Sequence, residues 1–267
     1  MNRLFSFLLF LLLLLPVCAV CEDAYSRIID VPGAGEFAYY AQNDPLWDAC
    51  LYEPYGSEKW RLMHGSGCGP TSAAMAIRHQ LPGEQLPHLL AFARSPERGF
   101  YLCPCSVNCY RCRGGHDRIH PQTPEEFEQY LPVIFASFAA GNNQRGSLFR
   151  QTGTSITFFE RLAENYGLDY CAYHSLDEAL DAVQQGSTVI TSVLEGIFTS
   201  SSHYLVIASV HDGWVYLLDP LMRDTYPIDK TGLLDVVEPG LVRIRLKDIE
   251  QAHLYGYYAF RAPETGT

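Results

Sequence analysis

The residue best placed to do chemistry is a single cysteine between two glycines. Cys68 stands in the run His64-Gly-Ser-Gly-Cys-Gly-Pro-Thr-Ser72, where Pro70 suits the first turn of a helix because its missing N–H is not needed there. Apolar residues follow at helical spacing, which predicts a helix over about 70–79. A thiol at a helix N-terminus lies at the positive end of the helix dipole, which favours the nucleophilic thiolate. The same pattern also fits a buried structural cysteine behind a glycine turn, so the interpretation depends on partners elsewhere.

A cysteine nucleophile needs a base that takes its proton and a third group that orients the base. His203 begins an apolar run, and Asp219 follows the run that returns after the turn His211-Asp-Gly213. A three-residue loop with Gly213 in the left-handed conformation would place Leu205 opposite Asp219. His203 then lies on the same face as Asp219, on the diagonal, where Cβ atoms are about 7–8 Å apart. A two-residue loop would put the two side chains on opposite faces, so this prediction depends on the turn.

Two further residues bear on the mechanism. The oxyanion formed by attack on a carbonyl needs two donors, the backbone N–H of the cysteine and a side-chain amide. The best candidate for the amide is Gln42, which ends a strand predicted over 37–42. His64 is a rival base, but we rank it below His203 because a short glycine tether to Cys68 does not orient a base. The separation of Cys68 and His203 falls within the range of about 130–150 residues found in papain-type enzymes.

The elements that would position these residues divide into a helical first half and a strand-rich second half. Helices are predicted over 70–79, 86–94, 123–131, 155–166 and 175–186, and strands over 188–194, 204–210, 214–218, 241–246 and 255–260. Thr123 and Ser175 each open a helix with a capping box. This segregation predicts an α+β fold with an N-terminal helical lobe packed on a C-terminal antiparallel sheet.

Composition limits the partners that the chain can have. Its 267 residues suffice for one large domain or two small ones, and 48% of them are hydrophobic, which allows a sizeable core. The formal net charge of −11 and the pI near 5.2 argue against nucleic acid and against an anionic membrane surface, because both select basic faces.

The N-terminus has the pattern of an export signal over residues 1–21. Arg3 supplies one positive charge, residues 4–17 are almost wholly apolar, and cleavage after Ala19 or Cys21 fits the signal-peptidase pattern. The alternative is an uncleaved anchor, because this stretch is only slightly shorter than a membrane span. We expect a secreted or cell-surface protein with no membrane span beyond the signal, and an exposed leader over residues 22–36.

An insert over residues 100–115 carries four closely spaced thiols. They are Cys103, Cys105, Cys109 and Cys112. They fit one structural zinc, with Cys109 and Cys112 as a chelating pair and His116 and His120 as substitute ligands. In an exported protein they fit two disulfides equally well.

The remaining cysteines matter because Cys68 must be free to act as a nucleophile. If the insert pairs within itself, Cys50 and Cys171 remain for a further disulfide. That arrangement leaves Cys68 unpaired.

Four stretches, taken together and in order, carry a family resemblance. They are Tyr40-Ala-Gln-Asn-Asp-Pro-Leu-Trp47, Gly65-Ser-Gly-Cys-Gly-Pro-Thr-Ser72, Ser202-His-Tyr204 and Leu218-Asp-Pro220. The chain from about 37 to 220 resembles the bacteriocin-processing, double-glycine-leader peptidase-like family of the papain-like cysteine peptidase superfamily. It looks like a stand-alone member, since the sequence shows no transporter domains, and the insert over 100–115 is not part of the family pattern.

The resemblance implies both a fold and a set of roles. The fold would be one papain-like domain over residues 37–262. Cys68 would be the nucleophile, His203 the base, Asp219 the group that orients the base, and Gln42 the oxyanion donor. No cofactor is required beyond the structural zinc that the insert allows.

The sequence therefore predicts an exported cysteine peptidase that hydrolyses a peptide or protein substrate through an acyl-enzyme. A non-catalytic peptide-binding module on the same fold is one alternative, and an acyl transferase or amidase with the same triad is another. The presence of both Cys68 and His203 favours catalysis, and a thiol-reactive peptide-like probe would distinguish these readings.

Overall fold

The structure is a computed structural model that describes residues 25–48, 52, 62–81, 123–140, 149–150 and 153–263. The predicted signal segment, the helix predicted over 86–94 and the cysteine-rich insert over 100–115 lie outside the described residues. In the part of the chain that is described, none of the helices has the length and apolar character needed to cross a membrane.

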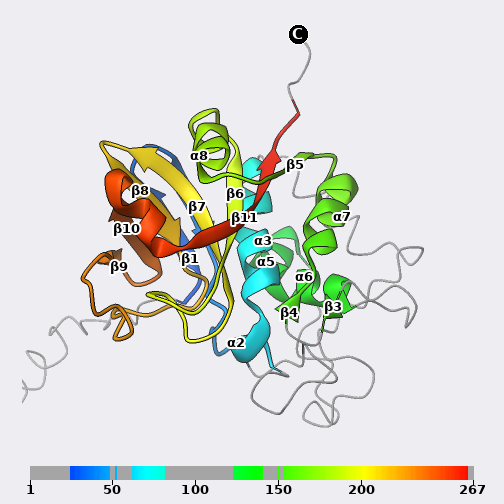
Figure 1. Cartoon of the computed structure of the whole chain (residues 1–267). Coiled ribbons are helices and arrows are strands. Elements are labelled where there is room, and N and C mark those ends of the chain that lie inside the picture. The colour runs from blue at the N-terminus through cyan, green and yellow to red at the C-terminus, as the bar shows by residue number, and fades with distance from the viewer. Residues whose placement is uncertain are drawn as a thin grey trace, which may run out of the picture.

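A seven-stranded antiparallel sheet forms the centre of the fold (Figure 1). The strands, in the order in which they lie side by side, are β5 (Asp169–Tyr173), β11 (Leu254–Arg261), β6 (Thr188–Val193), β7 (His203–His211), β8 (Trp214–Leu218), β10 (Leu241–Arg245) and β9 (Asp235–Glu238). The five strands predicted from hydrophobic runs are confirmed. The two edge strands β5 and β9 were not predicted, because their exposed residues give them no strong apolar alternation.

Helices cover both faces of the sheet. One face packs on a layer built around α3 (Cys68–Gln80), with Ile190, Val206 and Leu218 pointing into this core. The other helices of this layer are α2 (Met63–Ser66), α5 (Pro124–Gln129), α6 (Leu131–Ala140) and α7 (Ile156–Tyr166). The predicted helical lobe on an antiparallel sheet is thus confirmed.

The opposite face of the sheet has a core of its own. Alternate residues of the same strands, such as Val189, Leu205 and Leu217, pack there beneath α8 (Leu176–Gln184) and the 3-10 helix η6 (Leu246–Ala252). The sheet is therefore buried on both faces. The helical lobe around α3 covers one face, and α8 and η6 cover the other.

Local capping signals set several helix ends. The capping boxes opened by Thr123 and Ser175 are both formed, and Gly167 ends α7 in the left-handed conformation at φ 65°. Helix α6 was not predicted as a separate helix. It begins directly after the cap of α5, with Pro132 in its first turn, where the missing N–H of a proline is tolerated.

The segment expected to be an exposed leader over 22–36 is instead largely part of the folded domain. Strand β1 (Arg27–Val31) pairs with β2 (Gly35–Tyr39) in a hairpin, and Ile29, Val31 and Phe37 are buried in the core. The hairpin turn docks on the sheet, where Ser209 Oγ donates to the carbonyl oxygen of Pro32 at 2.6 Å. The alternation of apolar residues before the turn, rather than the turn itself, was the informative signal.

Two short strands, β3 (Phe149–Arg150) and β4 (Gly153–Thr154), form a separate ribbon beside α3.

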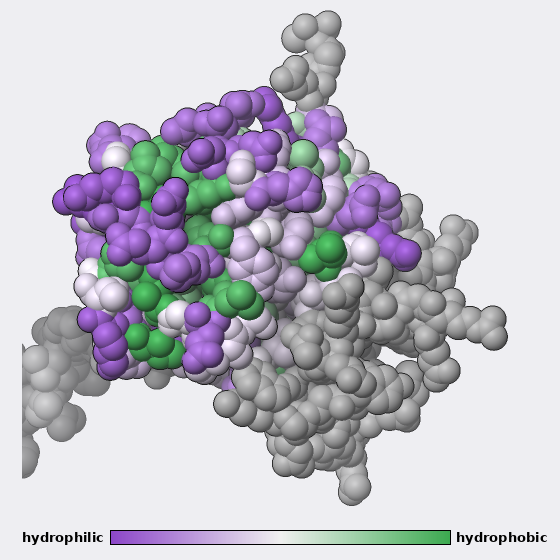
Figure 2. Space-filling model, viewed as in Figure 1, coloured by the Kyte–Doolittle hydropathy of each residue, from purple (hydrophilic) through white to green (hydrophobic). Residues whose placement is uncertain are grey.

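On the face shown in Figure 2, hydrophobic residues appear between hydrophilic ones over β7, β8 and η6. Some large hydrophobic side chains are exposed, among them Leu194 after β6 and Leu246 at the start of η6.

Candidate active site

Cys68 is the first residue of α3, which confirms the prediction that it stands at the start of a helix. Its side chain is buried with 9% exposed, and Gly67 precedes it as the N-cap. A Cβ atom at Gly67 would lie 2.6 Å from the Met63 carbonyl oxygen, and one at Gly69 would overlap the Thr154 side chain. The two glycines therefore allow other chain segments to approach the thiol closely, and the thiol lies at the positive end of a buried helix.

His203 and Asp219 are brought into direct contact by β7 and β8. Nε2 of His203 lies 2.7 Å from Oδ1 of Asp219, and the two side chains are 7% and 0% exposed. Because Nε2 faces the carboxylate, Nδ1 is the ring nitrogen left for Cys68.

The turn that produces this contact differs from the expected one. Asp212 and Gly213 form a two-residue turn, both with positive φ (48° and 75°), and Val210 pairs with Val215. By itself this turn would put His203 and Asp219 on opposite faces.

A β-bulge at Ala208 restores the alignment. The register shifts between Ile207 and Ser209, so that Ile207 pairs with Leu217 and Val206 with Leu218. Continuing this register by one residue places Leu205 opposite Asp219, and His203 lies two residues further on the same face. The predicted loop was wrong, but the predicted diagonal pair forms because the bulge supplies the missing residue.

His203 and Asp219 each stabilise the charged form of the other. Burial alone would lower the pKa of His203, but the charge and hydrogen bond of Asp219 and the hydrogen bond and charge of Cys68 outweigh it and raise this pKa to about 9. Burial alone would raise the pKa of Asp219, but His203 and then Arg223 hold it below its usual value. At neutral pH His203 is therefore an imidazolium beside the Asp219 carboxylate.

Gln42 joins the chain on either side of the site. Its backbone N–H donates to the Pro220 carbonyl oxygen at 2.5 Å, and its side-chain Nε2 donates to the His64 carbonyl oxygen at 2.7 Å. The side chain is buried, with 3% exposed, and among the described residues its Oε1 has no partner. The bond to the His64 carbonyl oxygen uses one of its two amide hydrogens.

The rival base His64 is placed differently. It is exposed, and its Nδ1 lies 3.1 Å from the Asp48 carbonyl oxygen. The imidazole of His203, in contrast, interacts with both Cys68 and Asp219.

The sequence did not predict the groups, other than His203, that hold Asp219 in place. Oδ2 accepts a hydrogen bond from Tyr226 Oη at 2.8 Å and forms an ion pair with Arg223 Nη2 at 3.0 Å. Oδ1 also accepts from the Leu221 N–H at 2.8 Å. The Tyr39 hydroxyl donates to the Asp219 carbonyl oxygen at 2.7 Å. Residues 219–223 form a loop rather than a helix, so their spacing in the sequence did not predict that Arg223 would reach Asp219.

A polar and aromatic row also lies beside the thiol. Ser192 pairs with Tyr204 on one neighbouring strand and with Tyr255 on the other. Burial raises the pKa of Tyr204 and of Tyr255, and the negative charge of Cys68 adds to this rise. Tyr255 is 41% exposed, so this row extends from the thiol to solvent.

The other cysteines that the sequence singled out do not form a second site within the described residues. Cys103, Cys105, Cys109 and Cys112 lie outside the described residues, and elsewhere, where side chains are described, no three metal-binding side chains come together. Cys171 is a free, exposed thiol, while Cys50 is outside the described residues.

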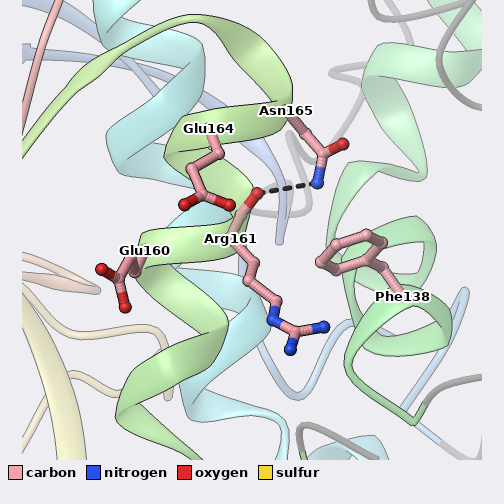
Figure 3. A pocket seen from close by; sticks show the side chains of 5 residues that line it. All are labelled: Phe138, Glu160, Arg161, Glu164 and Asn165. Carbon is pink, nitrogen blue, oxygen red and sulfur yellow. Dashed lines mark hydrogen bonds between the residues drawn. The ribbon is translucent and has the colours of Figure 1, made fainter. Parts of the chain in front are cut away.

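A surface hollow of about 530 Å³ lies between α6 and α7 (Figure 3). Its lining consists of Phe138, Glu160, Arg161, Glu164 and Asn165. Asn165 Nδ2 donates to the Arg161 carbonyl oxygen at 2.7 Å, so this contact lies within α7 itself. The hollow includes none of the residues around Cys68.

Residues 35–234, well over half of the chain, match the peptidase C39-like family. The chain is also similar to a crystal structure of a candidate C39-like peptidase from Bacillus anthracis, with 16% identity and a TM-score of 0.27. That match covers 39% of this chain and 56% of the other, so it spans little more than half of that protein. No protein with a curated description matches the chain.

Proposed function

Because the chain belongs to the peptidase C39-like family, we propose that it is an active cysteine peptidase with Cys68 as nucleophile, His203 as general acid and base, and Asp219 as the group that orients His203. The observation that carries the proposal is the buried His203, whose Nε2 lies 2.7 Å from Asp219 while the same ring interacts with Cys68 at the start of α3. A buried charged triad of this kind has little structural value, since apolar residues would fill the same space at lower cost.

In the first half of the reaction the Cys68 thiolate attacks the carbonyl carbon of the scissile peptide bond. The carbonyl π electrons move to oxygen, and the backbone N–H of Cys68 and the second amide hydrogen of Gln42 stabilise this oxyanion. The Cys68 N–H is free for this role because the first N–H groups of a helix have no acceptor within the helix. His203 gives its proton to the leaving amine, and the C–N bond breaks to leave a thioester.

In the second half water replaces the amine. Neutral His203 takes a proton from the water, the hydroxide attacks the thioester carbonyl, and the C–S bond breaks to release the acid. His203 is again an imidazolium beside the Cys68 thiolate, so the starting state is restored without a cofactor.

A peptidyl electrophile, such as a peptide vinyl sulfone, tests the reactive thiol. Intact-mass analysis should show one added label, with peptide mapping placing it on Cys68, and Cys68→Ala should abolish it. Cys171→Ala is the matched control, because Cys171 is the other free thiol among the described residues and is exposed rather than buried. A label on Cys171 alone, or labelling of Cys68 that is equally fast in His203→Ala, would contradict the proposal.

Hydrolysis itself needs a second experiment. A peptide library incubated with the protein should yield cleavage products that Cys68→Ala does not produce. Labelling of Cys68 without any cleavage would favour the peptide-binding or acyl-transfer alternatives.

Export is part of the proposal and is supported by the signal pattern over 1–21. Expression of the full chain in a bacterial host should give an extracellular or surface protein whose N-terminus is Val20 or Glu22. An intact N-terminus in the membrane fraction would indicate the uncleaved anchor.

A further inference from the structure

The carboxylate of Asp219 is shared between two cations. Oδ1 faces His203 Nε2 at 2.7 Å and also accepts from the Leu221 N–H at 2.8 Å. Oδ2 faces Arg223 Nη2 at 3.0 Å and also accepts from Tyr226 Oη at 2.8 Å. Each oxygen therefore has two partners, one of which is a cation. The carboxylate has no exposed surface. In a buried site this division of one negative charge affects both cations strongly.

Arg223 is held in a way that costs stability. Its guanidinium stacks on the Tyr226 ring, 4.7 Å from the ring centroid, and the side chain is 21% exposed. Its Nε is buried and has no hydrogen-bond partner within the described part of the chain. A buried N–H without a partner is unfavourable, and Tyr226 and Leu221 already satisfy Asp219 in part. The charge of Arg223 is therefore the property that its placement serves.

We propose that Arg223 tunes the charge state of the Cys68–His203 pair by sharing the Asp219 carboxylate with His203. Arg223 is in this view a positioning residue that acts through Asp219, and the inference rests on the proposed function of that pair. The positive charge of Arg223 offsets part of the field that Asp219 exerts on the imidazolium. His203 then releases its proton to a leaving amine more readily than it would with Asp219 alone.

The other groups around the carboxylate leave this role to Arg223. Among the described residues, the titratable and charged side chains that face Asp219, directly or one layer further out, are His203 on β7, Cys68 on α3, Tyr39 on β2, Tyr226 and Arg223 on the loop after β8, Arg27 on β1 and Glu238 on β9. Burial and then the charge of Asp219 raise the pKa of Tyr39 and of Tyr226 well above the usual value, so both stay neutral. Arg27 and Glu238 form an ion pair at 2.9 Å. Within the described part of the chain, Arg223 is thus the cation, other than His203 itself, that contacts the Asp219 carboxylate.

The test measures the titration of His203 without any substrate. The imidazole signals of His203 are followed by NMR between pH 6 and pH 11, and the alkylation rate of Cys68 by iodoacetamide is measured over the same range. In Arg223→Gln the midpoint should move up from about 9 by about half a pH unit or more, because a nearby like charge has been removed. In Arg223→Lys, which keeps the charge, the midpoint should stay close to that of the parent protein.

Two further variants make the result decisive. Arg245→Gln removes the same charge from an exposed residue of β10 that stacks on Trp214, and it should leave the midpoint unchanged. Arg223→Met is a second neutral variant whose chain can still pack on Tyr226. An unchanged midpoint in folded Arg223→Gln or Arg223→Met, or an equal shift in Arg245→Gln, would overturn the proposal.

Folding failure also gives an answer. If both neutral variants fail to fold while Arg223→Lys folds with an altered midpoint, the role of Arg223 is structural and the proposal is wrong. Because neither readout needs turnover, a protein that titrates as expected but cleaves no peptide would refute the proposed function and leave this inference standing.

Discussion

At the scale of single residues, the site depends on charges that burial alone would neutralise. Burial alone would lower the pKa of His203 and raise that of Asp219, yet the contact between them reverses both effects. Opposed shifts of this kind are typical of a buried ion pair, and strongly shifted pKa values are concentrated at functional sites.

The residue-scale prediction concerns turnover of a cleaved peptide. Cys68→Ala should abolish hydrolysis, and His203→Ala should remove nearly all of it. Asp219→Asn should leave a residual rate, since it disturbs only the charge and orientation of the imidazole, and Gln42→Ala should lower kcat by roughly 10²–10³, the effect of losing one oxyanion donor. Steady-state kinetics with Cys171→Ala as control would measure these effects.

Two results would contradict this order. Hydrolysis that survives Cys68→Ala would remove the nucleophile from the mechanism. Activity that survives His203→Ala but not His64→Ala would identify the other histidine as the base.

The pH dependence of stability follows from the raised pKa of His203. Its folded-state pKa of about 9 exceeds the ordinary value of 6.5, so protonated His203 contributes stability that is fully present below pH 6.5 and is lost as the pH rises through 9. Thermal unfolding from pH 6 to pH 10 should therefore show a decline that is smaller in His203→Gln. The exposed His211→Gln is the control, and a decline that is identical in all three proteins would refute the prediction.

At the scale of elements, the hairpin of β7 and β8 and the hairpin of β1 and β2 both converge on Asp219. The first hairpin brings His203 to the carboxylate through the bulge at Ala208. The second holds the backbone of Asp219 through the Tyr39 hydroxyl. The position of the carboxylate is thus fixed by two elements far apart in the sequence.

A pair of single-residue deletions tests the bulge. Deleting Ala208, which has no partner in the ladder, joins two paired stretches without a shift in register, so the Cys68 label should persist. Deleting Val206 instead would move His203 to the opposite face and should abolish labelling. Labelling assays on folded protein, checked by circular dichroism, compare the two, and loss of labelling in both deletions would show that the bulge does more than set the register.

A pair of glycine substitutions tests the second hairpin. Gly240 has φ +87°, and a Cβ there would overlap the Tyr39 ring, whereas Gly232 has φ +69° and open space around it. Gly232→Ala should cost about 1–2 kcal/mol from backbone strain alone, and Gly240→Ala should cost more because Tyr39 must also move. Urea unfolding measures the difference, and equal losses would show that the contact with Tyr39 is dispensable.

At the scale of the whole molecule, the fold joins a buried helix to a sheet that is covered on both faces. Helix α3 lies in the core with Cys68 at its N-terminus, and the strands supply His203 and Asp219. The chemistry is therefore placed where two layers meet, as is usual for ligand sites between packed elements.

The cysteine-rich insert is the whole-molecule prediction that remains. We expect Cys103, Cys105, Cys109 and Cys112 to form one compact cluster. Metal analysis with a free-thiol count on the purified protein would separate the alternatives, since one zinc with chelated thiols indicates a tetrathiolate site, and no metal with no free thiols indicates disulfides. Four free thiols without metal would refute both.

The sequence by itself determined the features whose causes are local. Capping boxes at Thr123 and Ser175, the glycine after α7 and the apolar runs of the central strands predicted elements that the structure confirms. Residue chemistry also singled out Cys68, His203 and Asp219 as candidates, because few side chain types can supply a nucleophile, a base and its partner. These inferences succeed because short-range hydrogen bonds and side chain type act without knowledge of the fold.

Only the tertiary structure decided the features that depend on contacts between distant segments. The bulge at Ala208 forms where the sheet sets the register. The β1–β2 hairpin becomes part of the folded domain through its hydrogen bonds to Ser209 and to the backbone of Asp219. Arg223 becomes a partner of Asp219 through the path of the loop after β8. The sequence signal at each of these positions is weak, because an exposed leader, a regular strand and a solvated arginine satisfy the same local rules. Long-range packing selects one arrangement, since only there are the buried charges and backbone groups around the Asp219 carboxylate satisfied.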